Sequence, residues 1–236
     1  MITYIAIVGD SGSGKTTSLR NLPQDKMVLI SPFKQDVPFK NNFTKLDTKA
    51  KTGNLINTSN ILHLPSIMKH IANDRPDIKY VIIDDITHFQ TKIISSDEFR
   101  ARNKGGEAFA RYVDFAGDMK SGLINEDLKL ADDRDLYVIH MFHETFNQAS
   151  GQRKIKLAGT LLEEKFDVSS YYNYVFYTKV LPVSEENKKG SQRYKFIVNN
   201  DGTCEAKSPL GLFDEDITLV PNDLNEIINK IEEFKK

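Results

Sequence analysis

The sequence predicts an α/β fold with a mostly parallel central sheet, helices on both faces and an extension of C-terminal antiparallel strands. Three observations lead to this prediction. Short apolar runs typical of buried strands alternate with helical patterns through residue 142. Two further strand-like runs, 174–180 and 194–198, follow each other closely and favour antiparallel pairing. An amphipathic helical pattern then covers residues 224–234.

Length and composition set the outer bounds. The 236 residues suit a single domain spanning 1–236, with residues 174–236 as an extension of that domain. With 32 basic and 33 acidic residues the formal net charge is −1, so any nucleic-acid site must be a local patch. The single cysteine excludes a disulfide within the chain. No leader-like segment and no apolar run of membrane-spanning length are found, so we expect a cytoplasmic location and no membrane partner.

The first strand leads into a phosphate-binding motif. The apolar run Ile5–Val8 is followed by GDSGSGKT, which fits GxxxxGK(S/T) at every fixed position. Glycines let successive backbone N–H groups face an anion, and a helix starting near Lys15 adds its positive dipole end. This P-loop pattern predicts a nucleoside triphosphate site, with Lys15 on the β- and γ-phosphates and Thr16 on Mg²⁺. The predicted nucleotide-binding residues are Gly9, Asp10, Ser11, Gly12, Ser13, Gly14, Lys15, Thr16 and Thr17, the last near the α-phosphate.

The next segments alternate between helix and strand. Pro23 ends the first helix, and residues 26–30 form a second buried strand. Residues 31–59 are polar with little periodicity, and we expect a hairpin or functional loop there without an assigned chemical role. Apolar residues at helical spacing predict a helix over 64–71.

An acidic pair follows the third apolar strand, 80–83. An apolar strand that ends in carboxylates beside a P-loop is the Walker B pattern, which places an acid next to Mg²⁺. We expect Asp84 to hold the metal through water and Asp85 to activate the attacking water as general base.

The strand 136–142 is followed by His143 and Glu144. Polar side chains at this neighbouring strand end are placed to sense the γ-phosphate. Glu144 competes with Asp85 for the role of base, and we favour Asp85. His140 lies within the strand and is expected to be a core residue.

The remaining segments are assigned from local pattern. Residues 87–125 contain two helical patterns around 104–106, residues 145–160 read as a polar loop, and 200–202 read as a hairpin turn. Asn222 is expected to cap the last helix, whose apolar face is Leu224, Ile227, Ile228, Ile231 and Phe234.

Taken together, the motifs GDSGSGKTTSLRNL, GNLINT, YVIIDD, the strand ending in HE, KIKLAGTLLEEK and AKSPLGLF followed by VPNDL resemble the RecA-like P-loop ATPases of bacteriophages. These are AAA-family ATP-binding proteins, of which the Sak-type single-strand annealing proteins are the best described. The resemblance spans nearly the whole chain. It departs at residues 30–33, where RecA-type recombinases carry a catalytic glutamate and this chain has no acid.

The resemblance implies an ATP hydrolase that uses Mg²⁺ and assembles as a homo-oligomeric ring or filament with ATP between neighbouring subunits. Lys207 lies where relatives carry a KNRFG-like motif, so it would reach the γ-phosphate held by the next subunit. The implied partner is single-stranded DNA in phage recombination or replication within the host cytoplasm, and a single-strand-binding protein is a further candidate. Two basic clusters are candidates for DNA contact: Arg100, Arg102, Lys104 and Arg111, and Arg153, Lys154 and Lys156.

Three alternatives stay open at this level. A nucleotide kinase would need an acceptor pocket and lid arginines, for which Arg100 and Arg102 are the candidates. A nucleotide-dependent switch would bind a protein partner and would not need hydrolysis. A motor on duplex DNA would show turnover that duplex stimulates.

Overall fold

The computed structural model describes residues 1–33, 36–101, 107–124, 128–130, 134–159, 163, 167–187 and 190–236. Within these ranges, no helix has both the length and the apolar character needed to cross a lipid bilayer.

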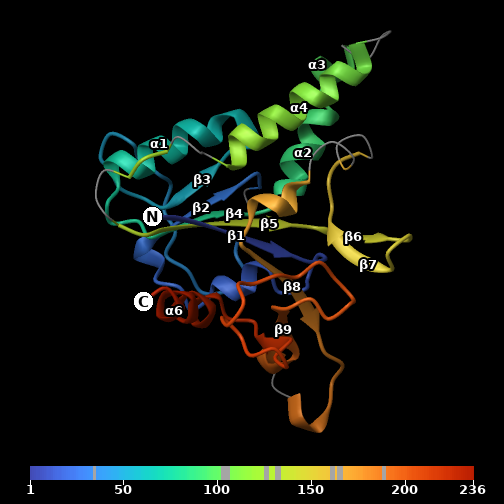
Figure 1. The fold of residues 1–236 in the computed structure, drawn as a ribbon. Coiled ribbons are helices and arrows are strands. Elements are labelled where there is room, and N and C mark those ends of the chain that lie inside the picture. Colours follow the sequence, from blue (N-terminus) through green and yellow to red (C-terminus); the bar gives the residue numbers. More distant parts are fainter. Residues whose placement is uncertain are drawn as a thin grey trace.

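One eight-stranded sheet crosses the molecule in the order β10-β9-β8-β1-β5-β4-β2-β3 (Figure 1). All pairs from β8 to β3 are parallel, and the β8–β9 and β9–β10 pairs are antiparallel. The predicted α/β class with a mostly parallel sheet is therefore confirmed. The strands are β1 Ile2–Val8, β2 Met27–Ser31, β3 Leu55–Asn57, β4 Tyr80–Ile83, β5 Leu136–Phe142, β8 Tyr174–Val180, β9 Tyr194–Ile197 and β10 Leu219–Pro221.

Helices cover both faces of the sheet. On one face lie α1 (Leu64–Asp74), α2 (Ile86–Ile94), the short α3 (Asp97–Ala101) and α4 (Glu107–Leu123). On the other lie α6 (Leu224–Phe234) and the short 3₁₀ helix η1 (Thr16–Leu19). Each face has its own apolar core, the first including Met68 and Phe89 and the second including Leu19 and Ile228. Further 3₁₀ turns are η2 Gln24–Lys26, η3 Ile61–His63, η4 Val168–Tyr171, η5 Glu185–Asn187 and η6 Gly190–Arg193.

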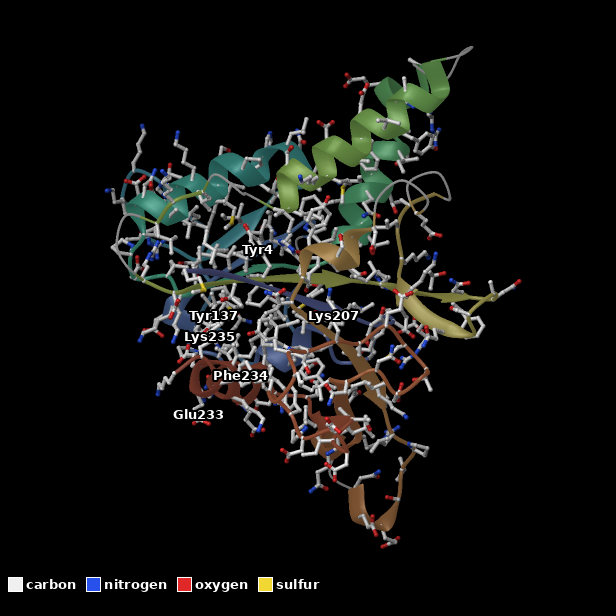
Figure 2. The ribbon with its side chains drawn as sticks, in the orientation of Figure 1. Tyr4, Tyr137, Lys207, Glu233, Phe234 and Lys235 are labelled. Atoms are coloured by element: carbon white, nitrogen blue, oxygen red, sulfur yellow. The ribbon has the colours of Figure 1, made fainter. Side chains whose placement is uncertain are left out.

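The apolar runs in the sequence follow from this two-sided burial. Along β1, Ala6 and Val8 join the core under α1, α2 and α4, whereas Ile5 and Ile7 join the core under α6. A strand buried on both faces needs apolar residues at every position rather than at alternate ones. Figure 2 shows the α6 side of this packing, where Lys235 reaches the ring of Tyr137 with its Nζ 5.2 Å from the centroid.

Strand β8 corrects one prediction. The sequence suggested that the C-terminal strands are all antiparallel, but Ile5–Val8 pairs in parallel with Tyr174–Tyr177. The chain between β5 and β8, residues 143–173, is long enough for the crossover that a parallel pair requires. Only β9 and β10 form the antiparallel extension. As a result, the carboxyl end of β8 lies at the same edge of the sheet as that of β1.

A hairpin occupies the region predicted as a polar loop. Strand β6 (Glu144–Asn147) pairs antiparallel with β7 (Gln152–Ile155) and projects beyond the carboxyl end of β5. The Asn147 side chain accepts from the Ala149 N–H at 3.0 Å, and Gly151 takes the positive φ of 71° that closes the turn. The strands were missed because they are mostly polar and only Ile155 is buried.

Three smaller predictions at the C-terminal end were also wrong or incomplete. The segment directly after the turn at residues 200–202 does not pair with β9, and the strand that does, β10, begins only at Leu219. Instead Cys204 bridges Arg153 of β7 and Lys207 bridges Val175 of β8. Helix α6 is capped by Asp223, whose carboxylate accepts from the Asn225 N–H at 3.0 Å. Phe234 is 44% exposed, so it is not part of the buried face of α6.

Candidate functional site

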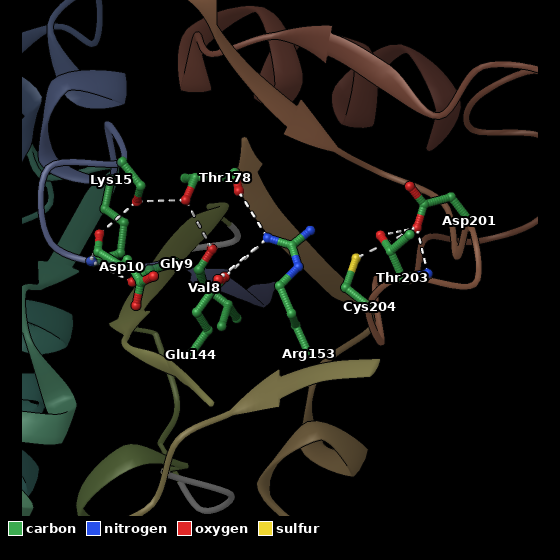
Figure 3. A network of polar contacts seen from close by, with 11 residues as sticks. Val8, Gly9, Asp10, Lys15, Glu144, Arg153, Thr178, Asp201, Thr203 and Cys204 are labelled. Carbon is green, nitrogen blue, oxygen red and sulfur yellow. Dashed lines mark hydrogen bonds and ion pairs between the residues drawn. The ribbon is translucent and has the colours of Figure 1, made fainter. Parts of the chain in front are cut away.

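The site begins with the glycine-rich loop, residues 9–15, between β1 and η1. Gly12 and Gly14 have φ values of 74° and 99°, which side chains with a Cβ rarely adopt. Gly9 is required by space instead, because a Cβ there would lie 1.7 Å from the Thr178 Oγ1. The Thr178 hydroxyl donates to Ser13 Oγ at 2.6 Å, which ties the loop to the carboxyl end of β8 (Figure 3).

Lys15 is folded into this loop. Its Nζ donates to the carbonyl oxygens of Gly9 at 2.6 Å and Asp10 at 2.8 Å, and the residue is buried. Burial lowers the pKa of Lys15 below its usual value, while the nearby carboxylates of Asp84 and Asp85 oppose the shift. The Lys15 ammonium group is therefore held by two carbonyl oxygens of the glycine-rich loop.

Thr16 and Asp84 bring two oxygens together across the sheet. The Thr16 hydroxyl donates to Asp84 Oδ2 at 2.8 Å. Burial raises the pKa of Asp84, and the hydrogen bond from Thr16 opposes it. Among the described residues there is no cluster of three His, Cys, Asp or Glu that could hold a metal by itself. Two hard oxygens fit Mg²⁺, which keeps water and substrate phosphates as its other ligands.

The Asp85 carboxylate, which lines the pocket, contacts two other residues. It takes a left-handed conformation with φ 65°, and its Oδ1 accepts from the His88 N–H at 3.0 Å as the N-cap of α2. Its Oδ2 lies 3.4 Å from His143 Nε2. Burial raises the pKa of Asp85, but the interactions with His143, the His88 N–H and Lys15 together outweigh it, and the net pKa is below the usual value.

The consecutive residues His143 and Glu144 have different partners, Asp85 and Arg153. Strand β5 lies between β1 and β4, so His143 follows it between the glycine-rich loop and the acidic pair. The His143 N–H donates to Thr87 Oγ1 at 3.0 Å. Glu144 turns to the other side of the loop, where it pairs with Arg153 at 3.2 Å (Figure 3). Burial raises the pKa of Glu144, and Arg153 opposes the shift.

A pocket of about 410 Å³ joins these groups. Nine predicted site residues line it, which are Ser11, Gly12, Gly14, Lys15, Thr16, Thr17, Asp84, Asp85 and His143. The rest of its wall is largely apolar and comes from β2, β3, the segment after β2 and β9: Leu29, Ser31, Phe33, Asp36, Val37, Pro38, Leu55 and Tyr194. Residues 31–59, which had no assigned role, therefore supply one wall of the pocket.

Glu144 lines a second pocket of about 340 Å³, together with Asp10, Ser13, Arg153 and Thr178. Both pockets are lined by Ser11 and Gly12. Glu144 does not line the pocket of Lys15 and Asp84 and is paired with Arg153, and its role as an alternative base stays a prediction.

The basic residues separate into three groups. Arg111 is buried and stacks over Phe99 at 4.0 Å from the ring centroid, so its prediction as a DNA-contacting side chain is wrong. Arg153 and Lys154 are paired with Glu144 and Glu163, the latter at 3.1 Å. Of the DNA-contact candidates, Arg100 and Lys156 are exposed, whereas Arg102 and Lys104 lie outside the described residues, and Lys207, predicted to act on a neighbour's γ-phosphate, is exposed as well.

Sequence reasoning missed Thr178 and Tyr194 as neighbours of the loop. Thr178 is buried near the carboxyl end of β8, and a parallel assignment of that strand would have brought it to the loop. Tyr194 lies against Gly14, where a Cβ would come within 2.8 Å of its ring. No signal in the sequence indicates that contact.

Comparison of the sequence with protein-family models and with curated proteins finds no match to either.

Proposed function

We propose that this protein is a Mg²⁺-dependent ATP hydrolase of the RecA-like P-loop class. The observation that carries the proposal is the single pocket in which the glycine-rich loop, the Thr16–Asp84 pair and His143 meet. A loop of N–H groups with a buried lysine suits a triphosphate, and an acid at the adjacent strand end suits its metal. The apolar wall formed by Leu29, Val37 and Pro38 suits a nucleobase.

In the proposed mechanism the chain mainly positions and neutralises charge. The loop N–H groups and Lys15 hold the β- and γ-phosphates once Lys15 leaves the carbonyl oxygens of Gly9 and Asp10. Thr16 and Asp84 would hold Mg²⁺, which when bound supplies charge neutralisation at the phosphate oxygens. His143 faces the same pocket from β5 and is placed to respond to the γ-phosphate.

We further propose a homo-oligomer, ring or filament, in which Lys207 of one subunit acts on the γ-phosphate of its neighbour. Lys207 is exposed and does not line its own subunit's pocket of Lys15 and Asp84, as a residue acting in trans requires. Its backbone is fixed by hydrogen bonds to Val175 in both directions, 2.9 and 3.0 Å. Because the backbone is already fixed, only side-chain entropy is lost when Lys207 reaches a neighbour.

Single-stranded DNA is the proposed partner, and the β6–β7 hairpin is its proposed contact. Phe146 on β6 is 60% exposed and pairs in register with Arg153 of β7. Lys156, just beyond β7, is exposed. A hairpin with an exposed aromatic ring, followed by an exposed lysine, suits base stacking combined with phosphate contact. Phage recombination or replication, in the host cytoplasm, is the setting that this activity would fit.

The kinase alternative is weaker. The candidate lid residue Arg100 lines a separate pocket with Phe99, Arg111 and Tyr112 rather than the pocket of Lys15. A lid must cover the phosphates that it stabilises.

The proposal is tested by ATP hydrolysis without DNA, with single-stranded DNA and with duplex DNA. We expect single strands to stimulate turnover, Lys15→Ala to abolish it, and Lys207→Ala to reduce it by at least about 100-fold. Lys69→Ala, which changes an exposed lysine on α1, is the matched control and should leave turnover unchanged. Turnover that ignores every DNA would contradict the recombination role, and phosphate transfer to added nucleotides would favour a kinase.

A further inference from the structure

Asp85, the side chain expected to activate water, already has partners for both of its carboxylate oxygens. Both carboxylate oxygens of Asp85 have partners, since Oδ1 accepts from the His88 N–H and Oδ2 lies 3.4 Å from His143 Nε2. Its backbone holds it in this position, because the left-handed φ of 65° turns the chain from β4 directly into α2. A carboxylate that caps a helix cannot also move to a water without losing the cap.

The other candidates for proton transfer in this pocket are few. Asp36 is exposed and lies on the wall across from the acidic pair's strand, and Asp84 is bound to Thr16. Glu144 belongs to the second pocket and is held by Arg153. His143 also lines the pocket. Its Nδ1 has no hydrogen-bond partner among the residues that the structure describes, so this ring nitrogen is available to accept a proton.

His143 is also held in place from two sides. Its backbone N–H donates to Thr87 Oγ1 at 3.0 Å, and its Nε2 faces Asp85. A carboxylate on one ring nitrogen fixes the tautomer that leaves the other nitrogen unprotonated.

We propose that His143 is the catalytic proton acceptor of this site and that Asp85 is its positioning residue. The proposal rests on the proposed hydrolysis of a nucleoside triphosphate. In the step, a water oxygen bonds to the γ-phosphorus while the bond from that phosphorus to the bridging oxygen breaks. The electron pair of the broken bond leaves with the nucleoside diphosphate. One water proton passes to His143 Nδ1 and then to solvent.

The experiment compares His143→Asn, Asp85→Asn, the double variant and Glu144→Gln in the full chain, with nucleotide affinity and turnover measured separately. His143→Asn keeps an amide group near the Nδ1 position, but an amide is not basic and cannot accept the proton. Asp85→Asn keeps the helix cap and tolerates the left-handed backbone. Circular dichroism and affinity for ATP verify that each variant is folded and binds.

We expect His143→Asn and Asp85→Asn each to lower turnover by at least about 100-fold. Affinity for ATP should stay within about threefold, and the double variant should be no slower than the slower single variant, as for residues that act as a unit. Free imidazole should restore part of the turnover of His143→Gly. Glu144→Gln should stay within about threefold of the wild type.

Other results would overturn the assignment. Near-normal turnover in His143→Asn, together with loss in Asp85→Asn, would make Asp85 the base itself. Loss in Glu144→Gln alone would return the role to Glu144. Absence of any triphosphate hydrolysis by a wild-type protein that binds ATP would remove the proposed function and this inference with it. Turnover by the wild type with an unaffected His143→Asn would remove only the inference.

Discussion

Replacing Gly9 with alanine tests the packing of the glycine-rich loop. A Cβ at this position would lie 1.7 Å from Thr178 Oγ1 and 2.7 Å from Ser13 Oγ. Overpacking of a buried site costs about 1–3 kcal/mol. Separating the two hydroxyls also loses their 2.6 Å hydrogen bond, a loss of about 1 kcal/mol. We therefore expect Gly9→Ala to lower the free energy of unfolding by about 2–4 kcal/mol.

Urea unfolding followed by far-UV circular dichroism measures this loss. Gly117→Ala is the matched control, because Gly117 lies in α4 and a Cβ there meets nothing within 4 Å. That control should leave stability unchanged or raise it by up to about 1 kcal/mol. Adding Thr178→Ala to Gly9→Ala should recover about 1–2 kcal/mol, because the 1.7 Å contact disappears. An unchanged unfolding midpoint in Gly9→Ala would refute the contact between the loop and β8.

Three further predictions concern the core, pH and the metal. Arg111→Ala should lower the free energy of unfolding in urea by about 2–4 kcal/mol, because it removes the stacking on Phe99 and the hydrogen bond to the Phe99 carbonyl oxygen. The folded variant should bind single-stranded DNA as the wild type does. A variant of unchanged stability with weakened DNA binding would contradict the structural role of Arg111. Burial lowers the pKa of His140 from 6.5 to about 3, so the unfolded chain takes up a proton on His140 at a higher pH than the folded protein does. The free energy of unfolding should therefore fall as the pH drops below about 6.5, by up to about 1.4 kcal/mol per pH unit. The urea midpoint plotted against pH should have a shallower slope in His140→Gln, and an equal slope would argue against a buried neutral imidazole. Asp84→Asn should remove most of the gain in ATP affinity that Mg²⁺ gives the wild type, as measured by calorimetry with and without the metal, and an undiminished gain would place the metal elsewhere.

Much of the fold could be predicted from the sequence because both faces of the sheet are covered. Strands such as Tyr80–Ile83 and Leu136–Phe142 appear as continuous apolar runs, and their predicted limits match the observed ones. The β6–β7 hairpin gave no such signal, since it carries polar residues and its order depends on a turn and on cross-strand pairing. Pairing direction was also hidden, because a strand buried on both faces looks alike in parallel and antiparallel sheets.

In the candidate site, likewise, some features could be predicted from the sequence and others could not. The fixed positions of the glycine-rich loop and the acidic pair were predictable because backbone conformation and metal chemistry restrict the residue types there. The roles of Asp85, Glu144 and Arg111 were not, because each depends on a partner on another strand or helix: His143, Arg153 and Phe99. The wall at Phe33 and residues 36–38 likewise follows from tertiary structure, as the Asn57 side chain donates to the Phe33 carbonyl oxygen at 2.7 Å.

The central claim is that the pocket at the glycine-rich loop binds a nucleoside triphosphate through Lys15. Equilibrium binding of a fluorescent ATP analogue to the wild type and to Lys15→Ala, with Mg²⁺ present, tests it most directly. We predict saturable binding that unlabelled ATP and inorganic triphosphate both displace, and an affinity at least about tenfold weaker in Lys15→Ala, as loss of a charge-assisted contact requires. No binding by the wild type, or equal affinity in the two proteins, would contradict the account.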